Sequence, residues 1–233
     1  MRARTIIKAA SFAALIALAG SALAQNLAPG FDALPRGARV AIMPTDIELF
    51  SISAGGVAEP KADWTEAASR HFKNALIEKK KSALKLDVVE LAEKDADEFD
   101  EINAIHGAIA RAIAMHHLGP GFMKLPTKDG KLDWSLGEST RAIKQATGAD
   151  YAFFTWVRDS YTSGERVATM IALAVLGVGV GGGVQTGYAS LVELETGRVL
   201  WFNRLARQSG DLREADRAAE TIDALLSGFP APK

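Results

Sequence analysis

Short apolar runs alternate with longer amphipathic segments along this chain, and that alternation constrains the fold most. The run from Arg39 to Met43 is closed by Pro44 and predicts a buried first strand. Residues 63–81 carry apolar side chains at helical spacing behind a capping box, with Asp63 as N-cap and Glu66 reaching back. A half-buried strand at 84–88 and a helix over 95–118 repeat the pattern. Strands that alternate with helices favour a βαβ core.

The second half of the chain adds antiparallel strands to this core. A third helix ends near Thr147, with Gly148 as its stop, and an aromatic strand follows at 151–157. Strands at 189–195 and 198–205 form a hairpin around Thr196-Gly197, and a capping box at 211–214 opens a last helix. The sequence therefore predicts an α/β domain of three layers. Its mixed sheet has about five strands with helices on both faces, and a hairpin and a C-terminal helix close it.

The first 24 residues have the pattern of a secretory signal peptide. Arg2, Arg4 and Lys8 precede a short apolar run, and Ala22-Leu23-Ala24 predicts cleavage before Gln25. We therefore expect a signal peptide at 1–24, a linker at 25–38 and one domain at 39–230. A bacterial lipoprotein would carry a cysteine at the cleavage point, and this chain has none. These residues predict release into the periplasm without lipidation.

Composition and motifs argue against several classes of site. The mature chain would hold 24 basic and 28 acidic residues, so it lacks the basic excess of a general nucleic-acid binder. Without cysteine there is no thiol nucleophile and no thiolate metal site. His106 and His117 lie eleven residues apart on one predicted helix, about 16 Å along its axis, which is too far for one metal. No catalytic motif is present, and we expect no cofactor, no metal and no enzymatic activity.

The stretch from Thr45 to Ala62 reads as a long loop at the carboxyl end of the first strand. Ligands of open α/β sheets bind at such ends. Three of its carboxylates could line a loop site: Asp46, Glu48 and Glu59. Solvated loop carboxylates are the simpler interpretation, and an acid–base pair remains the alternative.

The segment 167–184 is unusual because it has no charged residue. It could barely span a membrane, it could be a packing helix with close glycine contacts, or it could continue as a glycine-valine ribbon. Its glycines also match a dinucleotide motif, but they lead into a strand instead of a helix. We expect an apolar, glycine-rich insertion at 167–187 folded over its own sheet. The alternative is a surface for a membrane or another subunit, with these candidate contacts: Met170, Ile171, Leu173, Val175, Leu176, Gly177 and Gly181.

Four parts of the sequence together resemble a known group of envelope domains. These are the strand 39–44, the entry Gly148-Ala149-Asp150-Tyr151, the hairpin 189–201 and the closing helix that ends at 225–230. The pattern resembles the periplasmic domains of the curli-secretion channel lipoprotein and of the lipoprotein activators of penicillin-binding proteins. It is also similar to the amino-terminal domain of TolB. The resemblance implies a non-enzymatic α/β domain that binds envelope proteins or forms oligomers.

Three functions follow from these patterns. The first is a periplasmic interaction or assembly domain in envelope maintenance, with unidentified envelope proteins as partners. The second is a homo-oligomer that contacts a membrane through 167–187. The third is a small hydrolase or ligand-binding protein that uses the stretch 45–62.

Overall fold

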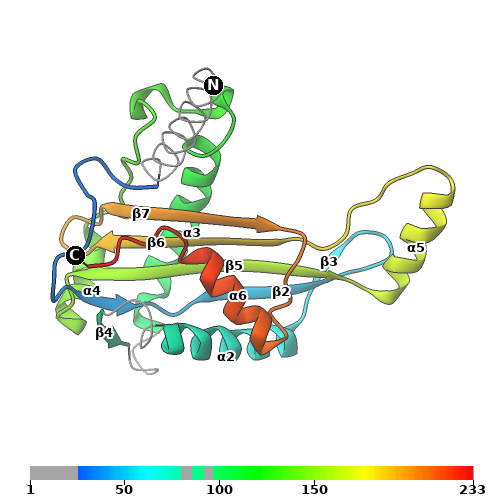
Figure 1. The fold of residues 1–233 in the computed structure, drawn as a ribbon, viewed down its shortest axis with the longest axis horizontal. Coiled ribbons are helices and arrows are strands. Elements are labelled where there is room, and N and C mark those ends of the chain that lie inside the picture. The colour runs from blue at the N-terminus through cyan, green and yellow to red at the C-terminus, as the bar shows by residue number, and fades with distance from the viewer. Residues whose placement is uncertain (1–25, 80–85, 92–96, 233) are drawn as a thin grey trace, which may run out of the picture.

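A computed structural model describes residues 26–79, 86–91 and 97–232 of the chain. The predicted signal peptide lies outside these residues. The described residues form one mixed sheet of seven strands with helices on both faces (Figure 1). This architecture confirms the predicted α/β fold class.

The sheet has β5 at its centre. The strands are β1 (Arg39–Ile42), β2 (Asp46–Ile52), β3 (Ala58–Pro60), β4 (Asp87–Glu90), β5 (Tyr151–Thr162), β6 (Gln185–Glu193) and β7 (Val199–Arg207). Along one edge of β5, β1 pairs with its first residues and β2 with its last, both in parallel. Along the other edge, β6 pairs antiparallel with β5, and β7 pairs antiparallel with β6.

β1 and β2 lie in line along β5 because the chain between them is only three residues long. The amide of Met43 still donates to the carbonyl of Phe153 at 3.0 Å, and the hydroxyl of Thr155 donates to that of Thr45 at 3.0 Å. Pro44 has no amide hydrogen to donate, so the ladder breaks there and resumes at Asp46. Residues 45–62, expected as a loop, instead form β2, a turn and β3. That expectation was wrong.

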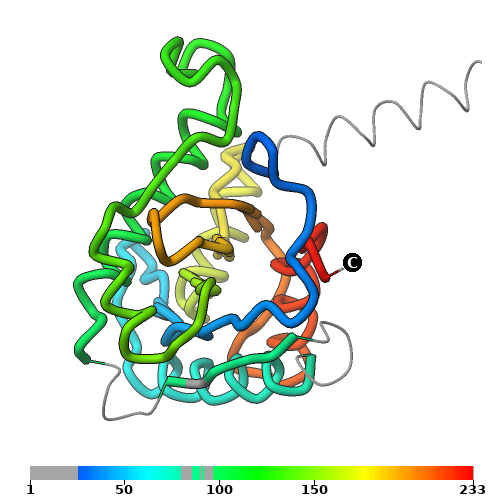
Figure 2. Tube along the Cα trace, turned by 90° about the vertical axis from the view of Figure 1, so that its left-hand side faces the viewer, coloured from blue at the N-terminus to red at the C-terminus, as the bar shows by residue number. Residues whose placement is uncertain are grey.

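Helices cover the sheet on both sides. The α-helices are α2 (Ala62–Lys79), α3 (Asp100–His116), α4 (Arg141–Thr147), α5 (Gly164–Val175) and α6 (Ala215–Leu225). Short 3-10 helices occupy Asp97–Phe99, Gly121–Met123, Pro126–Lys128 and Glu138–Thr140. In Figure 2, α2 and α6 lie on one side of the strands and α3 on the other. Two buried apolar clusters follow, one under α2 and α6 and one under α3 and α4.

Two helices begin at different residues from those expected. α2 begins at Ala62, so Asp63 lies inside its first turn and is not its N-cap. α6 begins at Ala215, after the expected capping box. There Asp211 instead accepts a hydrogen bond from the amide of Arg213 at 3.0 Å. The Gly148 stop of α4 is confirmed, since that residue adopts a left-handed conformation at the helix end.

Residues 26–38, expected as a linker, pack on the domain. Leu27 forms an isolated antiparallel bridge with Trp201, and the amide of Ala28 donates to the carbonyl of Leu200 at 2.8 Å. Leu34 is fully buried in the cluster beneath α2 and α6. This segment therefore covers part of the outer edge of β7.

Candidate interaction surface

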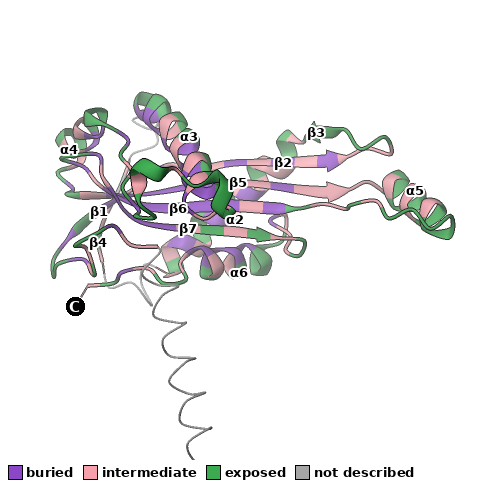
Figure 3. Cartoon of the chain, turned by 90° about the horizontal axis from the view of Figure 1, so that it is seen from above, coloured by how far each residue is buried: buried purple, intermediate pink, exposed green. Residues whose placement is uncertain are grey.

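An arm of residues 163–184 projects from one end of the sheet. It joins β5 to β6 and consists of α5 followed by an extended segment, which we call the glycine strip (178–184). Ser163 caps α5 by accepting a hydrogen bond from the amide of Arg166 at 3.1 Å. In Figures 1 and 3, α5 lies beyond the ends of the strands. The arm therefore does not fold over its own sheet, and the expected covering insertion was wrong.

One face of α5 exposes apolar side chains to solvent. Among its residues, none is buried. Val167, Ile171 and Val175 follow one another at four-residue spacing, so they share one face of the helix. Their exposed fractions are 43%, 63% and 82%. Such a stripe on a projecting helix is typical of an interaction surface.

The other candidate contact residues lie around this stripe. Leu176 and Gly177 are exposed where α5 ends, and Gly177 adopts a left-handed conformation that closes the helix. Met170 and Leu173 are half-buried. Met170, Ile171 and Gly181 line one groove together, although eleven residues separate the first from the last.

This groove runs between α5 and the glycine strip. It is open to solvent and has a volume of about 790 Å³. Val167, Met170 and Ala174 form its helical wall, and Val180 and Gly182 form part of the opposite wall. Thr162 and Gln208 add its few polar groups. None of the described residues that line it carries a charged side chain.

The base of the arm is fixed by Arg166. Its guanidinium donates to the carbonyl of Ala54 at 3.1 Å and to the carbonyl of Gly181 at 3.2 Å. Ala54 lies in the turn between β2 and β3, so one side chain ties α5, the glycine strip and that turn together. The arm is thus held in a defined place relative to the sheet.

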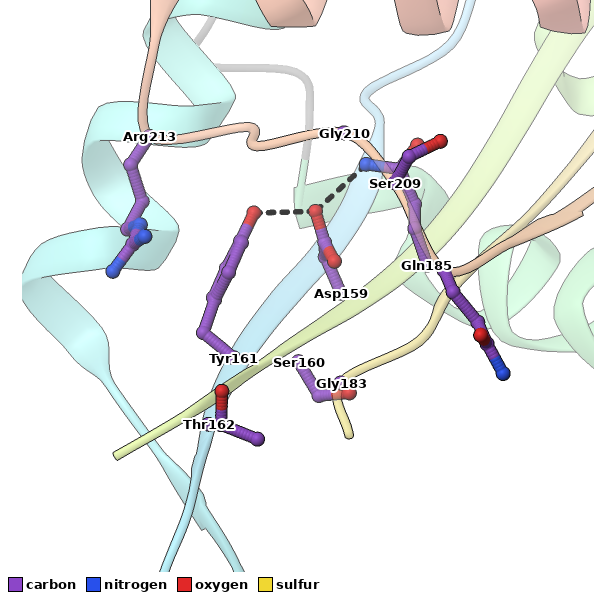
Figure 4. A pocket seen from close by; sticks show the side chains of 10 residues that line it. Asp159, Ser160, Tyr161, Thr162, Gly183, Gln185, Ser209, Gly210 and Arg213 are labelled. Carbon is purple, nitrogen blue, oxygen red and sulfur yellow. Dashed lines mark hydrogen bonds between the residues drawn. The ribbon is translucent and has the colours of Figure 1, made fainter. Parts of the chain in front are cut away.

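A smaller polar hollow of about 200 Å³ adjoins the groove and shares Thr162, Gly183 and Gln208 with it. Figure 4 shows buried Asp159 at its floor, where it accepts hydrogen bonds from the hydroxyl of Tyr161 and from Gln185. Burial raises the pKa of Asp159, although these hydrogen bonds oppose the shift.

The Tyr161 hydroxyl also accepts from the amide of Leu212 at 2.7 Å. Arg213 stacks on Tyr161 and forms an ion pair with Asp211. These contacts fix the segment between β7 and α6 against β5. Sequence reasoning missed this cluster because its members lie on three separate segments.

The three carboxylates of the expected loop site lie on strands. Asp46 and Glu48 lie on β2, and both form ion pairs with Arg158 of β5, with N–O distances of 2.7 and 3.2 Å. Glu59 lies on β3 and pairs with Lys61 at 3.7 Å. The structure thus brings Asp46 and Glu48 together at the guanidinium of Arg158, whereas Glu59 lies apart from them.

The histidines have separate environments. His106 is fully buried, stacks on Phe154 and shares a hydrogen bond of 2.9 Å with the hydroxyl of Ser190. Burial lowers the pKa of His106 to about 3. His116 instead contacts the carbonyl of Met123 at the surface. Among the described residues, no three His, Cys, Asp or Glu side chains gather as a metal site would require.

A second exposed apolar group lies at the far end of α3 and went unnoticed in the sequence. It consists of Met115, Phe122 and Met123, and Phe122 is 85% exposed. Phe122 and Met123 lie on a 3-10 helix of three residues. Within the described ranges, no helix combines the length and the apolar character that crossing a membrane requires.

No family model matches the sequence, and no curated protein matches it. The solved structures similar to this chain include the PelC dodecamer from Paraburkholderia phytofirmans, with 17% identity over 87% of this chain and 94% of that chain and a TM-score of 0.40. They also include the LpoB C-terminal domain from Salmonella enterica (13% identity, 78% and 88% coverage, TM-score 0.31) and the lipoprotein GNA1162 from Neisseria meningitidis (12% identity, 82% and 94% coverage, TM-score 0.34). Of these structures, GNA1162 is described as a lipoprotein.

Proposed function

We propose that this chain is a non-enzymatic interaction domain of the cell envelope, and that the arm is where it contacts a protein partner. The observation that carries the proposal is the exposed stripe of Val167, Ile171 and Val175 on a helix none of whose residues is buried. Leaving such side chains in water forgoes roughly 1.5–3 kcal/mol for each one that burial would stabilise. A partner that covers the stripe recovers this energy.

The charges of α5 favour a protein over a lipid surface as the partner. Helices that lie on membranes carry many Lys and Arg residues on their polar face. α5 has one basic residue, Arg166, whose guanidinium is engaged by two backbone carbonyls, and one acidic residue, Glu165. It therefore lacks the basic face that attracts anionic lipid.

We propose a periplasmic location because residues 1–24 have the pattern of a secretory signal peptide. GNA1162, one of the similar structures, is described as a lipoprotein. This chain has Gln25 at the predicted cleavage point and no cysteine anywhere, so no thioether-linked lipid can be attached there. We therefore propose a released domain that reaches its partner by binding alone.

The test follows the tagged full-length protein in cells after chemical crosslinking and fractionation. We expect release by osmotic shock and a crosslinked adduct with an envelope protein, identified by mass spectrometry. The paired substitution Ile171→Asp and Val175→Asp should remove this adduct without changing the amount of folded protein.

Phe122→Asp is the control, because it also replaces an exposed apolar side chain by an aspartate but lies outside the arm. It should keep the adduct. If the arm variant keeps the adduct while Phe122→Asp removes it, the proposed contact site is wrong. If the wild type resists extraction by carbonate, the arm enters lipid and a membrane-bound form replaces the proposal.

A further inference from the structure

The side of the sheet that faces α3 is covered over only part of its length. In Figures 1 and 3, α3 crosses the half of the strands that is farther from α5. The strand registers place Trp156, Tyr188 and Arg204 side by side in one row across β5, β6 and β7. Trp156 and Tyr188 are buried, whereas Arg204 and Ala206, which point to the same side of β7, are exposed. This row therefore marks the margin at which the sheet opens to solvent.

The row joins stacked aromatic rings to guanidinium groups. The ring centroids of Trp156 and Tyr188 lie 5.0 Å apart at an interplanar angle of 18°. Arg158 and Arg111 lie over the indole, with their Cζ atoms 4.5 and 5.7 Å from its centroid. Burial raises the pKa of Tyr188, and the positive charges of Arg204 and Arg111 oppose that rise. Arg111 and Arg204 therefore approach one phenol, the first from α3 and the second from β7.

A glycine within α3 makes room for this arrangement. Gly107 lies one turn before Arg111, and a Cβ at this residue would lie 3.2 Å from Trp156 Cδ1 and 3.6 Å from Arg111 Nη1. Glycine destabilises the interior of a helix, so its presence here has a structural reason. It lets the helix approach the indole closely and leaves space for the guanidinium. Arg111 is thus placed at the surface of the sheet.

Arg111 and Arg204 differ from most arginines that the structure describes because no group of the domain neutralises them. Within the described ranges, neither guanidinium has an acidic partner or a hydrogen-bond acceptor, and the hydroxyl of Tyr188 has no acceptor either. Arg158 on the same face is instead held by two carboxylates of β2. An acidic side chain also pairs with each of these arginines: Arg39, Arg70, Arg141, Arg213 and Arg217. Unused donors that approach one point from different elements are the pattern of an oxyanion site.

The surroundings of these donors favour a carboxylate of another protein as the ligand. Guanidinium groups bind both carboxylates and phosphates through paired N–H donors. A carboxylate carries a single charge, so it loses less hydration than a phosphate dianion beside the ring of Tyr188 and the methyl group of Ala206. Arg204 and Ala206 are exposed on the face of a sheet, where the surface of a second protein can cover them. Within the chain, Arg158 already shows the same pairing with carboxylates.

We infer that Arg111, Arg204 and the hydroxyl of Tyr188 form a binding site for a carboxylate of an acidic protein partner. Charge complementarity supports this occupant, because an acidic side chain neutralises two guanidiniums that the domain leaves unpaired. The mature chain would hold 24 basic and 28 acidic residues, so its net charge repels acidic peptides and only a local site can bind them. The inference rests on the proposed role as an interaction domain but not on the arm, which lies elsewhere on the molecule.

Substitutions that remove one charge or one hydroxyl test the site. Arg204→Gln and Arg111→Gln each keep a long polar side chain at an exposed position, so the fold should persist. Tyr188→Phe removes the hydroxyl and keeps the stacked ring. Arg217→Gln is the matched control, because it removes an exposed arginine of α6 whose guanidinium pairs with Glu220 at 2.8 Å.

The probe is a rhodamine-labelled peptide of alternating glutamate and serine, compared with the same peptide in which glutamine replaces glutamate. Fluorescence anisotropy with the mature protein should show saturable binding of the glutamate peptide, and this binding should weaken as salt is added. We expect binding at least about fivefold weaker for the glutamine peptide, for Arg204→Gln and for Arg111→Gln, and about twofold weaker for Tyr188→Phe. Arg217→Gln should bind as the wild type does.

Any of the following results would overturn the inference. They are no saturable binding of the glutamate peptide up to about 1 mM, equal binding of the glutamine peptide, an equal loss in Arg217→Gln and Arg204→Gln, tighter binding of inorganic phosphate or of phosphatidylglycerol vesicles, and self-association that Arg204→Gln abolishes. In the last case a second copy of this chain supplies the carboxylate.

The cellular adduct separates this inference from the proposed function. If Ile171→Asp with Val175→Asp removes the adduct while the wild type fails to bind the glutamate peptide, the proposed function stands and the carboxylate site is wrong. If the peptide binds as expected and the arm variant keeps the adduct, the carboxylate site stands and the arm is not the contact.

Discussion

Truncation of Ile171 should leave the stability of the domain almost unchanged. Its side chain is 63% exposed, so only about a third of it is buried. Full burial of an isoleucine stabilises a fold by roughly 1.5–3 kcal/mol, so Ile171→Ala should lose about 0.5–1 kcal/mol. The higher helix propensity of alanine returns a few tenths of a kcal/mol. The expected net loss in unfolding free energy is therefore below about 1 kcal/mol.

The same substitution in α3 provides the comparison. Ile113 lies on the buried face of that helix and is completely buried, and Ile113→Ala should cost about 2–5 kcal/mol because it removes contacts and leaves a cavity. Urea unfolding followed by tryptophan fluorescence measures both losses in the mature protein, at concentrations where sedimentation shows a monomer. A loss above about 2 kcal/mol for Ile171→Ala would mean that α5 packs on the domain, and the reasoning about the arm would be wrong.

Three further predictions concern the strip and the buried polar groups. Gly183→Ala should destabilise the domain by about 1–3 kcal/mol, since its Cβ would lie 1.9 Å from the carbonyl oxygen of Ser160, whereas Gly181→Ala meets open space and should be neutral in the same urea titration. His106 has its pKa lowered to about 3 by burial, so the folded state resists its protonation. The contribution of neutral His106 to the unfolding free energy is complete above its unfolded pKa of about 6.5 and is lost as pH falls toward 3. In His106→Phe, the urea midpoint should therefore depend less on pH over that range than in the wild type. Asp159 has its pKa raised by burial, so the opposite sign holds. The contribution of Asp159 to the unfolding free energy is complete below its unfolded pKa of about 3.9 and is lost as pH rises through the folded pKa. The urea midpoint of Asp159→Asn relative to that of the wild type should therefore increase with pH. A difference that stays constant with pH would contradict this.

Local patterns predicted most helices and strands but missed β2 and β3. Ile47 and Leu49 alternate with Asp46 and Glu48 as a half-buried strand requires, and their burial alternates accordingly. Pro44 ahead of them and the glycines behind them favoured a loop. The strand forms because β5 is long enough to pair with β1 and then with β2 along the same edge. Pairing with a strand a hundred residues away leaves no mark in the local sequence.

The sequence identified which residues form the candidate surface, but it did not predict where they lie relative to the sheet. The uncharged segment 167–184 stands out in the sequence, and its residues are those of the arm. An apolar segment between two strands is ordinarily buried, so folding over the sheet was the natural expectation. The guanidinium of Arg166 bonds to Ala54 and Gly181, and these contacts hold the arm beyond the strand ends.

The amino-acid sequence by itself determined most of the secondary-structure elements, the α/β class and the absence of charged residues from 167 to 184. These depend on periodicity and composition, which neighbouring residues carry. Only the tertiary structure decided that β1 and β2 share one edge of β5, that Asp46 and Glu48 pair with Arg158, and that the arm stands free of the core. Those outcomes depend on contacts between segments that are distant in the sequence, and these segments come together only when the sheet forms.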